Sequence, residues 1–195
     1  MKIEKLIGLL VMLSAPFLGA DIFMNGMGVA GTEYIHTRLG GFFYLIYMSG
    51  WMLAIWKLYK VNAAGISTGR YVLIFQLIVL ALANLSNVYE IIYPNSANES
   101  TIYHALDIFW PISNLTMIVT GISIIKSKVI NGWQRYSPLI VGFWIPAAIA
   151  LYFTIGETNR IFEILVACYS IAAWSLLGVA ISTLKTTESR VKIIN

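Results

Sequence analysis

The chain has 195 residues, of which 58% are apolar and 11% are charged, and its formal net charge is +4 at pH 7. Soluble domains carry about 25% charged residues, so the composition excludes an ordinary soluble domain. The positive net charge does not indicate nucleic-acid binding, because the basic residues are spread between long apolar stretches.

Uncharged runs recur along the sequence. Five of them reach the length of about 18 residues that predicts a helix able to cross the ~30 Å hydrocarbon core, and a shorter sixth run follows the N-terminus. No barrel-like alternation is present, and helices are the other way to satisfy the backbone in lipid. We therefore expect an all-α polytopic membrane protein, a single domain over residues 1–195. Its six transmembrane helices are expected at about 5–24, 40–59, 70–92, 102–125, 138–155 and 160–184.

The charged residues alternate between the two sides of the predicted membrane. Eleven of the 13 basic residues fall on one side, whereas seven of the nine acids fall on the other. The positive-inside rule assigns the basic side to the cytoplasm. This pattern predicts that both termini are cytoplasmic (N-in/C-in) and that the host membrane is a plasma membrane or a bacterial inner membrane.

The loop after the first predicted helix contains Gly26, Gly28 and Gly31, which match the G-x-G-x-x-G pattern of nucleotide sites. That motif needs a strand before it and a helix after it, and no strand is predicted here. We interpret the segment as a flexible extracytoplasmic turn. His36, which follows it, is expected to be a solvated or interfacial histidine.

The third predicted helix is apolar at its start and polar at its end. Gln76, Asn84, Asn87 and Glu90 follow one another at helical spacing and lie on roughly one face. Ionisable and amide groups at membrane depth are costly and are often functional. This face is therefore one half of the candidate site.

The fourth predicted helix supplies the other half. His104, Asp107, Trp110 and Asn114 share one face at three- and four-residue spacing. Pro111 has no N–H, and its ring displaces the carbonyl of Asp107 four residues earlier. We therefore expect a break in the helix beside the carboxylate.

The last two predicted helices carry packing signals. Pro146 removes a backbone donor from the fifth, and Gly178 with Ser182 forms a small-xxx-small pair in the sixth. The lone cysteine, Cys168, is expected to be a small buried apolar residue. The same polar groups can either line a cavity or hold helices together.

The candidate ligand-binding residues lie on the third and fourth predicted helices. They are Asn84, Asn87, Glu90, His104, Asp107, Trp110 and Asn114. The functional prediction is that they bind or pass a small solute or ion through a cavity between those helices that opens to the extracytoplasmic side. Asp107 would respond to protons or cations there.

Two alternatives stay open. One is a non-catalytic membrane subunit or assembly partner, which would use Gly178, Ser182 and the aromatic second helix as an interface. The other is a membrane redox enzyme that holds haem through His36 and His104, or a hydrolytic enzyme. No catalytic motif or metal box is present, so we lean towards a non-enzyme and predict no catalytic or metal residue, and the sequence indicates no particular cofactor. The expected partners are the lipid bilayer, a small solute or ion and further copies of the chain.

Overall fold

The computed structural model describes residues 3–26, 34–97, 99–156 and 160–184, and within these ranges the chain is helical and has no β-strand. Its α-helices are α1 Ile3–Asn25, α2 Arg38–Lys60, α3 Thr68–Ile92, α4 Thr101–Asp107, α5 Phe109–Ser127, α6 Ser137–Gly142, α7 Trp144–Ile155 and α8 Arg160–Thr183. The short 3-10 helices η1 Pro94–Ser96 and η2 Trp133–Tyr136 precede α4 and α6. Gly28 and Gly31 of the glycine pattern lie outside the described ranges, as does the C-terminal tail.

Most of these helices have the dimensions of membrane spans. Within the described residues, five segments are long and apolar enough to cross a membrane: Ile3–Asn25, Arg38–Lys60, Thr68–Ile92, Thr101–Ser127 and Arg160–Thr183. Trp133–Gly142 and Trp144–Ile155 meet the same criteria together but are bent by 53°. The predicted all-helical class is therefore confirmed, and five helical segments, or six if the bent pair forms one, are long and apolar enough to span a membrane.

Both interrupted spans are interrupted beside a proline. Ile108 separates α4 from α5 three residues before Pro111, and Phe143 separates α6 from α7 three residues before Pro146. A proline lacks the N–H that would bond the carbonyl four residues earlier, and its ring clashes with that carbonyl. In each case this carbonyl belongs to the last residue of the preceding helix. The break predicted beside Asp107 is therefore present.

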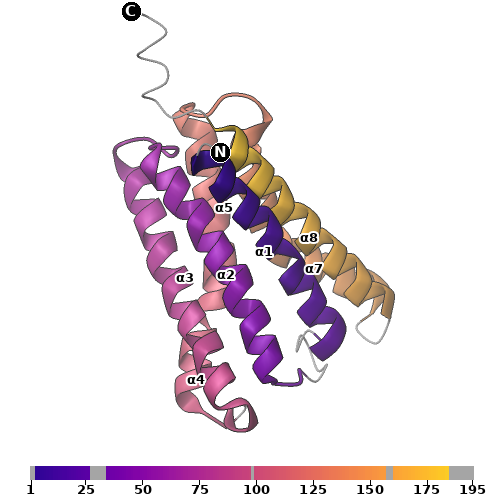
Figure 1. The fold of residues 1–195 in the computed structure, drawn as a ribbon. Helices are drawn as coiled ribbons and strands as arrows, with labels where there is room; N and C mark the ends of the chain where they lie inside the picture. Colours follow the sequence, from indigo (N-terminus) through magenta and orange to yellow (C-terminus); the bar gives the residue numbers. More distant parts are fainter. Residues whose placement is uncertain (1–2, 27–33, 98, 157–159, 185–195) are drawn as a thin grey trace, which may run out of the picture.

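The long helices stand side by side in a ring (Figure 1). α1 packs between α8 and α2, α3 packs between α2 and α5, and α6 packs against both α5 and α8. Sequence order therefore sets most neighbours, and the contact between the first and last helices closes the ring.

α1 and α8 approach each other through small residues. A Cβ atom added to Gly178 would lie 2.8 Å from the carbonyl oxygen of Gly8, and one added to Gly8 would lie 2.5 Å from Cβ of Ser182. The pair Gly178 and Ser182 is thus used inside the chain to pack α8 on α1. Cys168, on the same helix, is exposed, so its expected burial is wrong.

Three aromatic rings fill the centre of the ring of helices. Tyr47 and Trp51 of α2 and Trp174 of α8 are fully buried, and their ring centroids are 5.1–6.0 Å apart. We call these three residues the aromatic cluster. They lie in the middle of their helices, so they belong to the core about half-way between the two ends of the bundle.

The two ends of the bundle differ in charge. α1, α3 and α6 begin, and α2, α5 and α8 end, at what we call the basic end, and the opposite end is the acidic end (Figure 1). The described basic residues at the basic end are Lys5, Lys57, Lys60, Arg70, Lys126, Lys128 and Arg135. Asp21, Glu90, Glu99, Asp107 and Glu163 lie at or near the acidic end.

Candidate functional site

Two carboxylates from different helices are buried together at the acidic end. Asp21 lies one turn before the end of α1, and Glu90 lies two residues before the end of α3. Asp21 is 0% exposed and Glu90 is 1% exposed, and the charge of each acts on the other. Burying a carboxylate is costly unless hydrogen bonds, a proton or a cation compensate for its lost hydration.

Hydrogen bonds from Asn25 and Tyr34 compensate Asp21 in part. Nδ2 of Asn25, one turn later on the same face, donates to its Oδ1 at 2.5 Å. The same Nδ2 is 3.3 Å from Oγ1 of Thr37, the N-cap residue of α2, which accepts from the backbone N–H of Gly40 at 2.9 Å. Oδ2 of Asp21 is buried and has no hydrogen-bond partner among the described residues. No described residue therefore compensates the burial of this oxygen.

Glu90 is covered by the segment that leads into α2. Its Oε1 accepts from the hydroxyl of Tyr34 at 3.2 Å and from the backbone N–H of Thr37 at 3.3 Å. Nδ1 of His36 lies 3.2 Å from the same oxygen, and the His36 side chain is only 8% exposed. His36 was expected to be solvated or interfacial, and the solvated reading is wrong, because the chain turns back over Glu90 before α2 begins.

Tyr34 stays a donor in this setting. Burial, with smaller contributions from Tyr44 and the carboxylates Asp21 and Glu90, raises the pKa of its phenol above the ordinary value. The hydroxyl therefore remains protonated at neutral pH and donates to Glu90.

Gly40 makes room for this arrangement. A Cβ atom at Gly40 would lie 2.7 Å from Nδ2 of Asn25, 2.8 Å from Oδ1 of Asp21 and 3.0 Å from the hydroxyl of Tyr34. The polar atoms therefore converge on the first turn of α2, where a side chain would displace them. We call the surrounding set the acidic-end cluster: Asp21, Asn25, Tyr34, His36, Thr37 and Glu90.

Aromatic rings surround the acidic-end cluster. The ring of His36 contacts those of Tyr34 and Tyr103 edge to face, at centroid distances of 4.8 and 5.0 Å, and Tyr34 contacts Tyr44 at 6.2 Å. Tyrosine faces attract cations. The setting therefore combines negative oxygens with aromatic walls.

Of the residues predicted from sequence, three lie at this end. Glu90 is a member of the cluster. Asp107, half-buried at the end of α4, lies within electrostatic range of Glu90, His36 and His104. His104 is exposed on α4, with its ring 5.7 Å from that of Tyr103.

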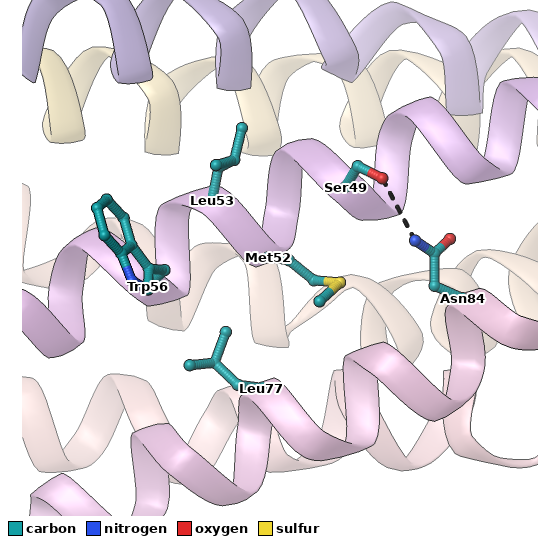
Figure 2. A pocket seen from close by; sticks show the side chains of 6 residues that line it. All are labelled: Ser49, Met52, Leu53, Trp56, Leu77 and Asn84. Atoms are coloured by element: carbon teal, nitrogen blue, oxygen red, sulfur yellow. Dashed lines mark hydrogen bonds between the residues drawn. The ribbon is translucent and has the colours of Figure 1, made fainter. Parts of the chain in front are cut away.

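Asn84 and Asn87 lie elsewhere, on the α2 side of α3. Asn84 lines a groove of about 590 Å³ between α2 and α3 together with Ser49, Met52, Leu53, Trp56 and Leu77 (Figure 2). Nδ2 of Asn84 donates to Oγ of Ser49 at 3.3 Å, and Oδ1 of Asn84 accepts from Nδ2 of Asn87 at 2.9 Å. These amides therefore belong to a second polar locus.

Asn114 and Trp110 form a third locus inside α5. Nδ2 of the buried Asn114 donates to the carbonyl of Trp110 at 3.1 Å, and the Trp110 ring contacts that of Trp144 at 5.1 Å. Gln76 joins α3 to α5 instead: its Nε2 donates to the Ser113 carbonyl at 3.0 Å, and its Oε1 accepts from Thr116 Oγ1 at 2.5 Å.

Sequence reasoning thus placed seven residues in one cavity, whereas the structure distributes them over three places. It did not select Asn25, Tyr34 or Thr37 for the site. A signal existed for Asn25, which follows Asp21 by four residues on a predicted helix. Tyr34 and Thr37 carried none, because a turn of the backbone brings them to Glu90.

Comparison with protein-family models, with curated proteins and with solved structures gives no match. Among the described residues, no group of three histidine, cysteine, aspartate or glutamate side chains is arranged to hold a metal ion. The chemistry of the acidic-end cluster is therefore the main guide to function.

Proposed function

We propose that this protein is a six-span membrane protein that binds a small ammonium-type cation at the acidic end of its helix bundle. The observation that carries this proposal is the buried pair Asp21 and Glu90, in which Oδ2 of Asp21 has no hydrogen-bond partner among the described residues. A buried carboxylate oxygen is strongly stabilised by a charged N–H donor.

The surroundings favour an ammonium group. An N–H of the ligand would donate to Oδ2 of Asp21, and the rings of Tyr34, His36 and Tyr103 supply aromatic surfaces close by. Asp107 and His104 lie towards α4, where they would meet an arriving solute.

The segregation of charge supports an orientation for this site. Under the positive-inside rule the basic end faces the cytoplasm. Both termini are then cytoplasmic, and the acidic end opens to the extracytoplasmic side of a plasma or bacterial inner membrane. The solute would therefore arrive from outside.

The interior favours binding over a continuous pore. Tyr47, Trp51 and Trp174 are fully buried and in mutual contact between the two ends. Passage of a solute would require this aromatic cluster to move. Binding without passage is therefore the simpler function.

Thermal unfolding of the purified protein tests the proposal. Methylammonium chloride should raise the melting temperature relative to N-methyl-D-glucamine chloride at equal ionic strength, because a ligand that binds only the folded state stabilises it. Asp21→Asn should abolish this rise, whereas Glu99→Gln should keep it, because Glu99 is an exposed acid at the same end. Equal responses of all three proteins would contradict the proposal.

A further inference from the structure

We propose a second and independent binding site: the groove between α2 and α3 holds a membrane-dissolved molecule that carries a carbonyl oxygen on an apolar, quinone-like body. The groove is about 590 Å³ in volume. Ligand pockets for small organic molecules are typically about 300–1,000 Å³ and mostly apolar, with a few placed polar groups. The volume and the mostly apolar lining of this open groove lie within that range.

The walls and the polar end of the groove are distinct. Met52, Leu53 and Leu77 form its apolar wall, and Trp56 stands at the end nearer the basic end of the bundle (Figure 2). Ser49 and Asn84 form the other end, joined by their hydrogen bond (Figure 2). A bound molecule would therefore lie along the helices, with its polar atom towards Ser49 and Asn84.

The polar pair retains donors. A side-chain amide has two N–H groups and a hydroxyl has one O–H, and Asn84 uses one N–H on Ser49 while its oxygen accepts from Asn87. Within the described part of the chain, no acceptor is bonded to the second N–H of Asn84 or to the hydroxyl hydrogen of Ser49. The matching group on a ligand is an acceptor oxygen, so a carbonyl suits this site better than an amine or a hydroxyl donor.

The depth of the pair narrows the ligand class. Ser49 is the central residue of α2, so about 16 Å of helix lies on either side of it at 1.5 Å per residue. This places the donors near the middle of a ~30 Å hydrocarbon core. The ester oxygens of phospholipids lie at the interface, outside that core, so the ligand must carry its oxygen into the bilayer centre.

The approach to the groove is from lipid. The apolar residues Phe75, Ile78 and Leu85 of α3 are each about half exposed. Both α2 and α3 are long and apolar enough to span a membrane. This outer surface of α3 therefore faces the acyl chains. A lipid-soluble molecule could enter sideways without passing the acidic-end cluster.

Retention by proteoliposomes tests this site directly. The probe is 2,3-dimethyl-1,4-naphthoquinone, which has no free position for thiol addition, and the control compound is 2,3-dimethylnaphthalene, which has the same shape without carbonyls. Proteoliposomes should retain the quinone in saturable excess over protein-free liposomes, and the hydrocarbon should show no such excess. Chromatographic quantification after dialysis gives both values.

Two variants assign the excess to the groove. Ser49→Ala and Asn84→Leu together should weaken quinone binding by roughly tenfold or more, because each hydrogen bond contributes about 1 kcal/mol. Ser123→Ala is the matched control, because Ser123 is a half-buried serine of α5 that does not line the groove. Ser49→Ala alone gives a milder change if the double variant fails to fold.

Two results would overturn the proposal. Equal retention of the quinone and the hydrocarbon would show partitioning into lipid alone. Unchanged quinone retention in Ser49→Ala, with the protein folded, would show that any binding lies elsewhere. Neither result bears on cation binding at the acidic end, which the methylammonium experiment tests separately.

Discussion

The two ends of α1 each hold an acidic side chain, but within the described part of the chain only Glu4 has a basic partner of fixed charge. At the basic end, Oε1 of Glu4 lies 3.5 Å from Nζ of Lys57, with the side chains 22% and 5% exposed. At the acidic end, Asp21 is fully buried beside Asn25 and close to a second acid, Glu90. The difference separates an acid that joins α1 to α2 from the acid that we propose binds a cation.

The polar residues of α3 show the same difference. The nitrogen and the oxygen of the Gln76 side-chain amide are both hydrogen-bonded to α5, so Gln76 links α3 to α5. Glu90 bonds a turn of the backbone and lies beside Asp21, whose Oδ2 lacks a partner among the described residues. The hydrogen bonds of Gln76 therefore compensate its burial, whereas those of Asp21 leave one oxygen without a described partner.

The largest expected effect concerns which end faces outward. In a Cys168→Ser background, a cysteine at Ser96 near the acidic end should react with an impermeant maleimide in intact cells. A cysteine at Ser67 near the basic end should react only after the cells are opened. Both positions are exposed, so the reverse pattern would reverse the assigned orientation.

Lys57→Met should remove the ion pair between Lys57 and Glu4 at the basic end. Glu4 would lose its buried partner, and we expect a loss of about 2 kcal/mol in the free energy of unfolding, below the 3–5 kcal/mol of fully buried pairs because Glu4 is partly exposed. Chemical unfolding of the reconstituted protein measures it. Methylammonium should still stabilise the variant, and restoration of stability in a Glu4→Leu/Lys57→Met double variant serves as the control.

Gly40→Ala should disturb the acidic-end cluster. The added Cβ would press on Asn25, Asp21 and Tyr34 at 2.7–3.0 Å, and overpacking of this kind costs about 1–3 kcal/mol. We expect a lower melting temperature and weaker methylammonium binding together. Leu39→Ala is the control, because Leu39 is exposed in the same first turn of α2 as Gly40. Unchanged binding in Gly40→Ala would show that the converging atoms do not form the site.

Gln76→Leu should have the smallest effect. It removes two hydrogen bonds between α3 and α5, but Thr116 keeps its bond to the Ser113 carbonyl, and amide pairs between membrane helices contribute about 0.6 kcal/mol on average. We expect a slight loss of unfolding free energy and normal methylammonium binding in the same titration. Loss of binding would mean that the link between α3 and α5 at Gln76 affects the acidic-end cluster.

Much of the architecture was accessible from local rules. The uncharged runs indicated the helices, and Pro111 indicated the break after α4, because both depend on residues within a few positions of each other. The meeting of Asp21 with Glu90 was not accessible, because it depends on how α1, α2 and α3 pack and on the turn that covers Glu90. Asn84 and Glu90 seemed to share a face of one helix, yet one lines the groove and the other joins the cluster, since different neighbours cover the two halves of α3.

Isothermal titration of methylammonium chloride into the purified protein tests the central claim most directly. The account predicts saturable binding of one methylammonium per chain by the wild type and by Glu99→Gln, and no saturable heat with Asp21→Asn, although that variant still folds. Binding by Asp21→Asn at wild-type affinity, or no saturable heat with the wild type, would contradict the assignment of the buried carboxylates to a cation site.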